Sequence, residues 1–448
     1  MGKLFGTDGI RGKANKSPMD GPTAFKVGAA LTRILKRKNR RPVIVVSKDT
    51  RISGDMLEGA LVSGITSMGG DVCLTGIFPT PGVAFAARDM NADAGVMISA
   101  SHNPFHDNGI KIFSGKGFKL SDEEEKEMEE GILNSSFSDS LPEPEEIGTL
   151  VAVENSGQRY IEFVKRGFPM LSLKGVRIVL DTANGATFRT APEAFRQLGA
   201  QVKVINDEPD GLNINERCGS QHTEGLGREV VKDGAFMGLA FDGDGDRLIA
   251  VDEKGDEISG DQCMFICAMN LKTQGLLKND VLVGTVMSNL GLRLACREKG
   301  IKFHASKVGD RYVMEDMKSL GAVLGGEQSG HMIFLDHHTT GDGIISALQL
   351  ASAVISQGSP LSRLKNMIHI YPQKLINVEV KSRPDILKIP EIAAVISEVE
   401  KTLGDHGRVL VRHSGTQDMC RVMVEGPDVE ITGIHCSKIA EKIRSVLG

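Results

Sequence analysis

The six residues from Asp242 to Arg247 have the composition of a metal-binding turn. They read Asp-Gly-Asp-Gly-Asp-Arg, so three carboxylates stand at alternate positions. Alternate side chains of an extended backbone point to the same side, and the two glycines permit a tight loop. Hard divalent cations prefer oxygen ligands, and Mg²⁺ keeps positions open for water or a phosphate oxygen. The spacing therefore predicts that Asp242, Asp244 and Asp246 bind an ion of the Mg²⁺ kind.

Two other interpretations of this turn compete with a Mg²⁺ site. In a calcium-binding EF-hand loop starting at Asp242, Glu253 would fall at the twelfth position, as required. That loop also needs Gly at its sixth position, where this chain has Arg247, and it needs flanking helices rather than apolar, strand-like residues. The second alternative is a solvated acidic turn without an ion. The pattern favours a Mg²⁺ site over both.

A second polar turn follows the apolar run that ends at Ile98. The segment Ser99-Ala100-Ser101-His102-Asn103-Pro104 supplies hydroxyl, imidazole and carboxamide groups within a few residues. A serine hydrolase would show a G-x-S-x-G elbow, which this segment lacks. Alone, the segment fits a structural Ser/Asn turn equally well. Combined with a metal-binding loop elsewhere in the chain, its hydroxyl becomes a candidate phosphoryl carrier.

Buried strands are expected to position these turns. Pro42–Ser47 is a nearly continuous β-branched run, typical of a strand that is buried on both faces of a parallel sheet. Further apolar runs that lead into polar, Gly-rich loops are Val176–Leu180, Met237–Phe241, Val281–Val286 and Ala322–Leu324. Ligands gather at the carboxyl ends of strands in open α/β sheets. We therefore expect an α/β fold of three similar α/β domains with mixed sheets around a central cleft.

The end of the chain and its linkers complete the predicted organisation. After Gln373, strand-like and helical segments mix in the manner of a small C-terminal α+β domain. The acidic segment Ser121–Glu146 predicts an exposed helix and linker whose charges face solvent. Further boundaries are expected near Glu253–Ser259 and Asn366–Gln373. The predicted domains are residues 1–150, 151–255, 256–368 and 369–448.

Composition excludes several classes of protein. The chain has 448 residues, with 53 Lys and Arg against 58 Asp and Glu, and 40% of its residues are hydrophobic, which excludes intrinsic disorder. An acidic chain with three Tyr and no Trp lacks a nucleic-acid-binding character. We find no apolar stretch approaching the roughly 18 residues that cross a membrane, and no signal-peptide pattern. We read the seven scattered cysteines as reduced thiols. The expected protein is cytoplasmic and binds neither nucleic acid nor membrane.

Several motifs together resemble the α-D-phosphohexomutase superfamily. Ser99–Pro104, Asp242–Arg247 and Glu327–His331 occur in the order and spacing of that superfamily. Further segments resemble its branch that acts on glucosamine phosphates, namely Phe5–Gly12, Asp210–Ser220 and Lys307–Tyr312. The resemblance covers essentially the whole chain. Several motifs in the expected order are far more specific than any one of them.

The resemblance implies a set of residues around the transferring phosphoryl group. Ser101 would be a phosphoserine that donates and recovers this group. One Mg²⁺ would be held by Asp242, Asp244, Asp246 and an oxygen on phosphorylated Ser101. The remaining implied catalytic residues are His102 and Lys111, for acid–base help, and Arg11 and Arg247, for positive charge.

The resemblance also implies residues that recognise the rest of the substrate. Glu327 and Ser329 match a loop that binds sugar hydroxyls, and His331 stands next to them. The implied grip on the non-transferring phosphate consists of Arg412, Ser414, Gly415, Thr416 and Arg421. The superfamily pattern there is close to R-x-S-G-T-E-P, whereas this chain continues with Gln417-Asp418. We therefore do not expect those two residues to contact the ligand.

By resemblance, the chain interconverts glucosamine 6-phosphate and glucosamine 1-phosphate through a 1,6-bisphosphate. A bisphosphate sugar would be the activator, the product would feed UDP-N-acetylglucosamine synthesis, and a homodimer is expected by family. The alternatives are a phosphomannomutase or phosphoglucomutase, a Mg²⁺-dependent sugar phosphatase, and a catalytically silent sugar-phosphate sensor. Gln328 favours the amino sugar, because the mannose and glucose relatives usually carry Met there. The complete set of Ser101, the three aspartates and Lys111 argues against a sensor.

Two other polar pairs have simpler interpretations. Arg51 lies in a segment that matches the superfamily, but it could equally pair with Asp49 within its loop. His337 and His338 are adjacent, and we favour a surface loop for them.

Overall fold

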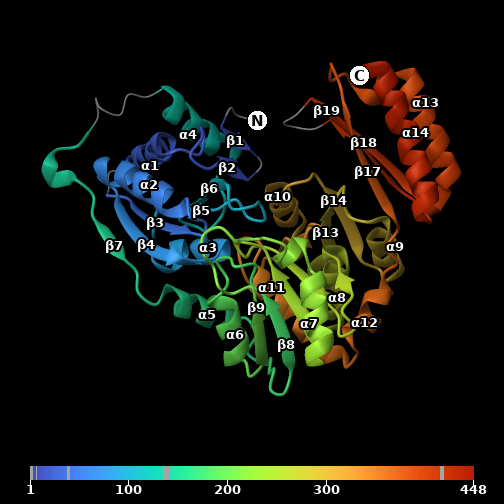
Figure 1. Cartoon of the computed structure of the whole chain (residues 1–448), viewed down its shortest axis with the longest axis horizontal. Coiled ribbons are helices and arrows are strands. Elements are labelled where there is room, and N and C mark those ends of the chain that lie inside the picture. Colours follow the sequence, from blue (N-terminus) through green and yellow to red (C-terminus); the bar gives the residue numbers. More distant parts are fainter. Residues whose placement is uncertain (1–3, 7, 38–40, 135–140, 414–417) are drawn as a thin grey trace. The chain divides into compact units, whose positions relative to one another are not determined.

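In a computed structural model, which describes residues 4–6, 8–37, 41–134, 141–413 and 418–448, the strands form four sheets (Figure 1). By the packing of its backbone, the chain divides into two compact units. Unit 1 comprises Met1–Met287 and Lys302–Asn366 and contains the first three sheets. Unit 2 comprises Ser288–Ile301 and Met367–Gly448 and contains the fourth.

The first sheet of unit 1 has seven strands in the order β1-β2-β6-β5-β3-β4-β7. The parallel strands β3, β4 and β5 form its centre, and β6 runs antiparallel to β5. The strands are β1 Phe5–Gly6, β2 Gly9–Lys13, β3 Val43–Lys48, β4 Asp71–Ile77, β5 Ala94–Ile98, β6 Asp107–Ser114 and β7 Leu150–Ala152. The helices are α1 Gly21–Lys36, α2 Gly54–Ser67, α3 Thr80–Asp89 and α4 Asp122–Asn134.

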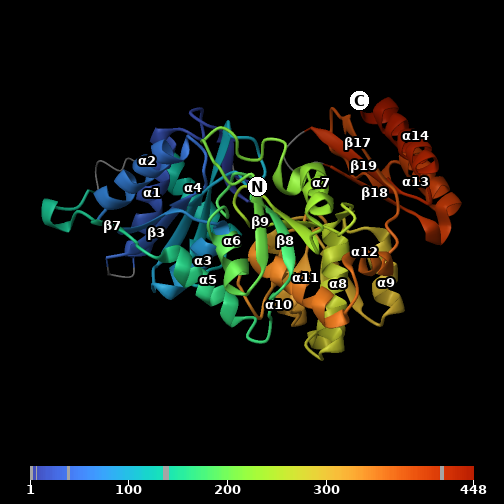
Figure 2. The same ribbon diagram turned by 60° about the horizontal axis from the view of Figure 1, so that its bottom comes forward.

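Helices α1 and α2 lie side by side over this sheet (Figures 1 and 2). Their backbones approach closely at two glycines. A Cβ atom on Gly64 would lie 2.0 Å from the carbonyl oxygen of Phe25, and one on Gly28 would lie 2.3 Å from that of Leu61. Apolar side chains of both helices and of the strands β3 and β5 make one buried core. This core holds the end of β5, from which the Ser101 turn begins.

The second and third sheets of unit 1 are also mixed. Their orders are β12-β11-β10-β8-β9 and β14-β13-β15-β16. The strands are β8 Arg177–Asp181, β9 Gln201–Ile205, β10 Met237–Phe241, β11 Leu248–Val251, β12 Glu257–Ile258, β13 Val281–Thr285, β14 Lys302–Ser306, β15 Leu324–Gly326 and β16 Met332–Phe334. The helices are α5 Ser156–Arg166, α6 Thr190–Gln197, α7 Glu224–Asp233, α8 Gly260–Thr273, α10 Asp310–Leu320, α11 Gly343–Gln357 and α12 Leu361–Leu364.

Unit 2 contains a three-stranded antiparallel sheet in the order β17-β19-β18. Helices α13 and α14 lie side by side on one face of it (Figures 1 and 2). The elements are α9 Leu290–Glu298, β17 Gln373–Glu379, α13 Pro390–Leu403, β18 Arg408–His413, β19 Met419–Glu425 and α14 Val429–Leu447. Three α/β sheets followed by an α+β region confirm the predicted fold class. The central cleft and the three boundaries between the four predicted domains stay predictions.

The charges of the acidic helix α4 mostly face solvent, as predicted, and its apolar side chains are buried. Asp122 to Glu124 at the start of α4 face solvent, but Met128 and Ile132 are buried in the core of the first sheet. Glu125 pairs with the guanidinium of Arg311 at 2.6 Å. This one pair was not predicted, because a run of carboxylates does not reveal a distant basic partner.

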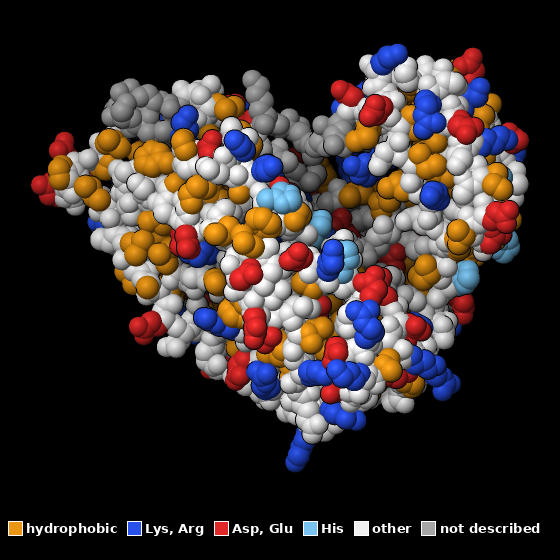
Figure 3. All heavy atoms as spheres, in the orientation of Figure 1, with side chains coloured by type: hydrophobic (Ala, Val, Ile, Leu, Met, Phe, Trp, Pro, Cys, Tyr) orange, Lys and Arg blue, Asp and Glu red, His pale blue; other side chains and the backbone are white. Residues whose placement is uncertain are grey.

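Charge and apolar surface are distributed without large blocks on the face seen in Figure 3. Acidic and basic side chains alternate over the region of α7 and α8. The seven cysteines carry free thiols, as predicted. Within the described ranges, no single helix has the length and apolar composition to cross a membrane. Among the residues that the structure describes, one pair of helical segments meets those criteria together, α11 and Leu361–Met367, and the two are bent by 90° at their junction.

Candidate active site

The predicted metal-binding residues lie in the turn between β10 and β11. One carboxylate oxygen from each of Asp242, Asp244 and Asp246 lies within 4.8 Å of the others, and all three side chains are buried. Two of the oxygens, Asp244 Oδ1 and Asp246 Oδ1, have no hydrogen-bond partner among the described residues. Buried carboxylate oxygens left without partners are costly unless a cation or donor meets them. The donor set therefore fits a hard divalent cation.

The Ser101 turn lies directly against the metal-binding turn. Ser101 Oγ donates a hydrogen bond to Asp242 Oδ2 at 2.5 Å, and the Ser101 side chain is fully buried. A Cβ atom at Gly243 would lie 2.7 Å from the carbonyl oxygen of Ser101, so only glycine permits this approach. His102 Nδ1 lies 3.4 Å from Ser101 Oγ. The two turns that the sequence singled out are thus brought into contact by the ends of β5 and β10.

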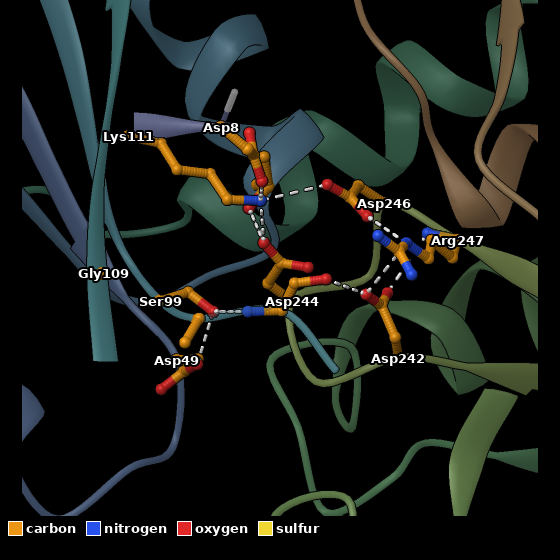
Figure 4. A network of polar contacts seen from close by, with 12 residues as sticks. Asp8, Asp49, Ser99, Gly109, Lys111, Asp242, Asp244, Asp246 and Arg247 are labelled. Atoms are coloured by element: carbon orange, nitrogen blue, oxygen red, sulfur yellow. Dashed lines mark hydrogen bonds and ion pairs between the residues drawn. The ribbon is translucent and has the colours of Figure 1, made fainter. Parts of the chain in front are cut away.

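Three cationic side chains surround these carboxylates. Lys111 Nζ, on β6, lies 2.7 Å from Asp244 Oδ2 and 3.1 Å from Asp246 Oδ2. Figure 4 shows Lys111 reaching toward these two carboxylates, while Arg247 lies beside the oxygens of Asp242 and Asp246. Arg11 Nη1 donates to the carbonyl of Ala100 at 3.4 Å.

The arginines retain unused donors. The Nε atoms of Arg11 and Arg247 are buried and have no hydrogen-bond acceptor within the described part of the chain. Guanidinium N–H groups that lack a hydrogen-bond acceptor suit the oxygens of a phosphate group. The site can therefore bind an anion as well as a cation.

Burial and charge set the protonation of this cluster. Burial alone would lower the pKa of Lys111, but Asp244, Asp246 and Asp8 raise that pKa well above its ordinary value. Burial, together with repulsion from Asp246 and Asp244, raises the pKa of Asp242 well above its usual range. Lys111 therefore stays positively charged, and Asp242 holds a proton more readily than an exposed carboxylate does.

The two histidines of the predicted site have opposite protonation. Burial and the positive charges of Arg247 and Arg11 lower the pKa of His102 to about 4, so its ring is neutral near pH 7. His331 is buried too, yet Asp246 and Asp310 outweigh that burial and raise its pKa to about 9. The sequence could not separate these two cases, because the charges that decide them come from distant segments.

The predicted sugar-binding loop joins β15 to β16. Glu327 and Ser329 are half-buried, and Glu327 Oε1 accepts a hydrogen bond from the Gly309 N–H at 3.0 Å. His331 is buried, with Nδ1 3.5 Å from Asp246 Oδ1 and Nε2 3.5 Å from Asp310 Oδ2. The structure thus places His331 between the metal-binding turn and α10. Sugar binding by these residues stays a prediction.

This loop and the metal-binding turn are joined through their backbones. Leu248 N–H donates to the carbonyl of Gly330 at 3.0 Å, and Arg247 and His331 form an isolated antiparallel bridge. Gly343 N–H donates to the carbonyl of Gly245 at 2.9 Å.

Three charged residues of the cluster carried no predicted role. Asp8 contacts Lys111 Nζ at 3.1 Å and also pairs with Arg11 and Lys119. Lys119 Nζ lies 2.5 Å from Asp310 Oδ2. Asp8 and Asp310 belong to motifs quoted for the superfamily resemblance, so a signal existed for them. Lys119 had none.

The residues predicted to grip the second phosphate belong to unit 2. Arg412 on β18 and Arg421 on β19 stand directly opposite each other in the antiparallel pair. The Nε atom of Arg421 is buried and has no hydrogen-bond partner among the residues with described positions. Opposed like charges are unfavourable unless an anion lies near them. Ser414, Gly415 and Thr416 lie outside the described residues.

The two simpler interpretations had different outcomes. Arg51 Nε pairs with Asp49 Oδ2 at 2.8 Å, as predicted for a pair within the loop, and both side chains are fully buried. His338 is buried, with Nε2 2.8 Å from the carbonyl oxygen of Pro81, so the surface prediction for it was wrong. Its partner lies in α3, far away in the sequence.

Comparison with known proteins gives matches along the whole chain. Four models of the phosphoglucomutase/phosphomannomutase family match it in order: alpha/beta/alpha domain I at residues 2–139, domain II at 158–255, domain III at 259–371 and the C-terminal domain at 375–442. A phosphoglucosamine mutase of Syntrophobacter fumaroxidans is 59% identical, and one of Syntrophus aciditrophicus is 55% identical. Each alignment covers 100% of both chains.

Solved structures share the fold at low sequence identity. A phosphoglucomutase/phosphomannomutase family protein from Burkholderia thailandensis has a TM-score of 0.80 and 23% identity, covering 98% of this chain and 97% of that one. N-acetylphosphoglucosamine mutase from Aspergillus fumigatus, in complex with GlcNAc-6P and magnesium, has a TM-score of 0.71 and 16% identity. That match covers 99% of this chain and 96% of that one.

Proposed function

We propose that this chain interconverts glucosamine 6-phosphate and glucosamine 1-phosphate, because it belongs to the phosphoglucosamine mutases of the phosphoglucomutase/phosphomannomutase family. Phosphorylated Ser101 gives its phosphoryl group to the free hydroxyl of the substrate, so the bond from phosphorus to Oγ breaks and one to the sugar oxygen forms. The resulting 1,6-bisphosphate reorients, and its other phosphoryl group returns to Oγ. A bisphosphate sugar activates enzyme whose Ser101 is unphosphorylated.

One contact carries this proposal most directly. Ser101 Oγ is held at 2.5 Å from Asp242, beside Asp244 Oδ1 and Asp246 Oδ1, two buried oxygens that accept no hydrogen bond from the described residues. A serine that only stabilised a turn would not need three buried carboxylates beside it. A phosphorylated serine does, because a divalent cation can then lie between its phosphate oxygens and those carboxylates.

Asp242, Asp244 and Asp246 would hold one Mg²⁺ together with an oxygen of phosphorylated Ser101. When bound, the ion supplies positive charge that offsets the charge on the transferring group. The chain adds fixed positive charge of its own through Lys111, which stays protonated. These groups need no reorganisation during transfer, because burial and ion pairs hold them in place.

His102 and the two arginines have separate proposed roles. The neutral ring of His102, 3.4 Å from Ser101 Oγ, can accept a proton from a hydroxyl at the reacting centre. The Nε donors of Arg11 and Arg247, which have no hydrogen-bond acceptor among the described residues, can donate to phosphate oxygens. Both roles follow from the donors and charges at the site.

The rest of the substrate is proposed to meet two further sets of residues. Glu327 and Ser329 exchange hydrogen bonds with sugar hydroxyls. His331 positions the metal-binding turn through its contact with Asp246. The non-transferring phosphate binds Arg412 and Arg421 together with the loop of Ser414, Gly415 and Thr416. The opposed arginines support this assignment, since a phosphate dianion relieves their repulsion.

Phosphorus NMR of the purified protein tests the activity. Glucosamine 6-phosphate, Mg²⁺ and a trace of glucose 1,6-bisphosphate are supplied, so that an unphosphorylated Ser101 cannot be mistaken for an inactive enzyme. We expect a growing signal of a sugar 1-phosphate, abolished in Ser101→Ala. Accumulation of inorganic phosphate instead would identify a phosphatase. Faster conversion of mannose or glucose 6-phosphate would reassign the sugar.

The cellular setting is proposed more simply. A cytoplasmic location and a homodimer are expected of this enzyme, and fractionation of cells and light scattering of the purified protein test them. The homodimer prediction fails if the scattering mass equals that of one chain.

A further inference from the structure

Ser101 has a backbone conformation that its residue type disfavours. Its φ angle is +54°, in the left-handed region where the Cβ atom of an L-residue is crowded. Such conformations persist only where the surroundings determine them, and they concentrate at functional sites. The groups that hold the Ser101 backbone therefore decide where Oγ points.

Hydrogen bonds fix the peptide groups on both sides of Ser101. Its N–H donates to Ser99 Oγ at 3.0 Å, and the Ser99 hydroxyl donates in turn to Asp49 Oδ2 at 2.5 Å. Its carbonyl oxygen accepts from Arg51 Nη2 at 2.9 Å and from Asn215 Nδ2 at 2.9 Å. The carbonyl of Asn103 accepts from the same two side chains, at 2.8 Å and 3.0 Å.

The guanidinium of Arg51 uses all its donors, one on Asp49 and the other four on carbonyls between Ser101 and Asp107. Nε donates to Asp49 Oδ2 at 2.8 Å, and Nη2 donates to the carbonyls of Ser101 and Asn103. Nη1 donates to the carbonyls of Asp107, at 3.0 Å, and Pro104. A guanidinium has five N–H groups in a rigid, planar arrangement, and here each has an acceptor.

We propose that Arg51 is a positioning residue for phosphoryl transfer, whose guanidinium holds the left-handed backbone of Ser101 and thereby aims Oγ at Asp242. This inference rests on the proposed function and deepens it. Arg51 does not bind the substrate, because its side chain is fully buried and no N–H group is left over for a ligand. Asn215, on the side of the metal-binding turn, supports the same two carbonyls.

Charge alone does not account for Arg51. A lysine would keep the positive charge beside Asp49, but it has three donors and no planar fork, so it cannot serve the carbonyls of both Ser101 and Pro104. The conservative variant Arg51→Lys therefore separates geometry from charge. Misplacement of a reacting atom by about 1 Å lowers turnover by about 100-fold.

The test measures two activities of Arg51→Lys at saturating Mg²⁺. One is transfer of a phosphoryl group from glucose 1,6-bisphosphate to Ser101, followed by intact mass. The other is the conversion of glucosamine 6-phosphate, analysed for kcat and KM. Lys365→Gln is the matched control. This substitution breaks an ion pair of 2.6 Å between Lys365 and the buried Asp252, in the same unit, and Lys365 contacts neither the Ser101 turn nor the metal-binding turn. Thermal unfolding of all variants shows which are folded.

We expect both rates to fall about 100-fold in Arg51→Lys with KM changed by less than about twofold, because an interaction that orients Oγ affects turnover and not ground-state binding. Lys365→Gln should keep wild-type kcat. Wild-type kcat in folded Arg51→Lys would overturn the proposal. So would a raised KM with unchanged kcat, which would make Arg51 a binding residue.

A second variant keeps the proposal testable if Arg51→Lys does not fold. Asn215→Ala removes two hydrogen bonds to the same carbonyls and leaves Arg51 in place, and about a tenfold loss of kcat is expected. Wild-type kcat in Asn215→Ala would then overturn the premise of the proposal, that donors to these two carbonyls set the position of Oγ. If the bisphosphate phosphorylates Ser101 in the wild type but glucosamine 6-phosphate is not converted, the proposed function is wrong. The positioning role of Arg51 is then tested by the rates of phosphoryl transfer to Ser101 alone.

Discussion

Replacing Lys111 with Met tests whether this side chain and a divalent cation compete for the same carboxylates. Lys111 Nζ lies 2.7 Å from Asp244 Oδ2, 3.1 Å from Asp246 Oδ2 and 3.1 Å from Asp8 Oδ2, and the side chain is 1% exposed. Met fills a similar volume without charge. The metal-free variant therefore keeps its packing but leaves three buried carboxylates without this cation.

The size of the effect follows from a thermodynamic cycle. Removing one partner of a buried ion pair destabilises a protein by about 3–5 kcal/mol. Two of the three acceptors belong to predicted metal ligands, so a bound cation replaces most of the lost charge, and Asp8 keeps Arg11 and Lys119. If about 1 kcal/mol of the loss remains in the metal-bound form, the difference of about 3 kcal/mol appears as roughly 100-fold tighter Mg²⁺ binding.

Calorimetric titration with Mg²⁺ and thermal unfolding in EDTA or Mg²⁺ measure the two sides of this cycle. Lys119→Met is the matched control, because Lys119 pairs with Asp8 and Asp310 but with no predicted metal ligand. It should destabilise the protein without changing Mg²⁺ affinity. Equal or weaker Mg²⁺ binding by Lys111→Met than by the wild type would refute the competition.

Three further predictions concern strain and protonation. Ser101→Gly should be more stable than Ser101→Ala by about 1 kcal/mol, because both lose Oγ but only Ala keeps a Cβ at φ +54°; equal denaturation midpoints would contradict the strain. His331 has a pKa raised from 6.5 to about 9, so its protonated form contributes on the order of 3 kcal/mol below pH 6.5, lost as pH rises through 9. The stability gap between wild type and His331→Gln should therefore narrow over that range, and a pH-independent gap would refute it. Because the pKa of Asp242 is raised, Mg²⁺ binding should release a proton, and the affinity for Mg²⁺ should fall as the pH falls. The released proton is taken up by the buffer, so a calorimetric heat of binding that is the same in buffers of different ionisation enthalpy would contradict this prediction.

Local patterns were sufficient to predict the centre of the site. The alternating aspartates, the glycine between the first two and the buried strand before them all act within a few residues, so Asp242–Asp246 could be recognised directly. Ser101 followed a buried strand in the same way. The structure then brings Ser101 Oγ to Asp242, 141 positions apart, which required knowledge of the fold rather than of either turn.

Residues whose roles depend on distant partners could not be predicted. Lys119 has no signal in its neighbourhood, and only the fold brings it to Asp8 and Asp310. The burial of His338 could not be predicted, because its acceptor, the carbonyl of Pro81, is 257 positions away. The Asp49–Arg51 pair was foreseen as a local contact, but the four carbonyls that Arg51 serves were not. Sequence periodicity predicts the secondary structure of a residue's own segment, but it does not predict which distant segment will contact that residue.

The backbone links between the metal-binding turn and the predicted sugar-binding loop constrain how specificity can be engineered. Leu248 N–H bonds to the Gly330 carbonyl, and a Cβ atom on Gly330 would lie 2.1 Å from the Leu248 carbonyl oxygen. A loop transplanted from a mannose- or glucose-specific relative must therefore match this backbone as well as the new sugar. Chimeras that exchange residues 242–248 and 327–331 together should fold more often than those that exchange either segment alone.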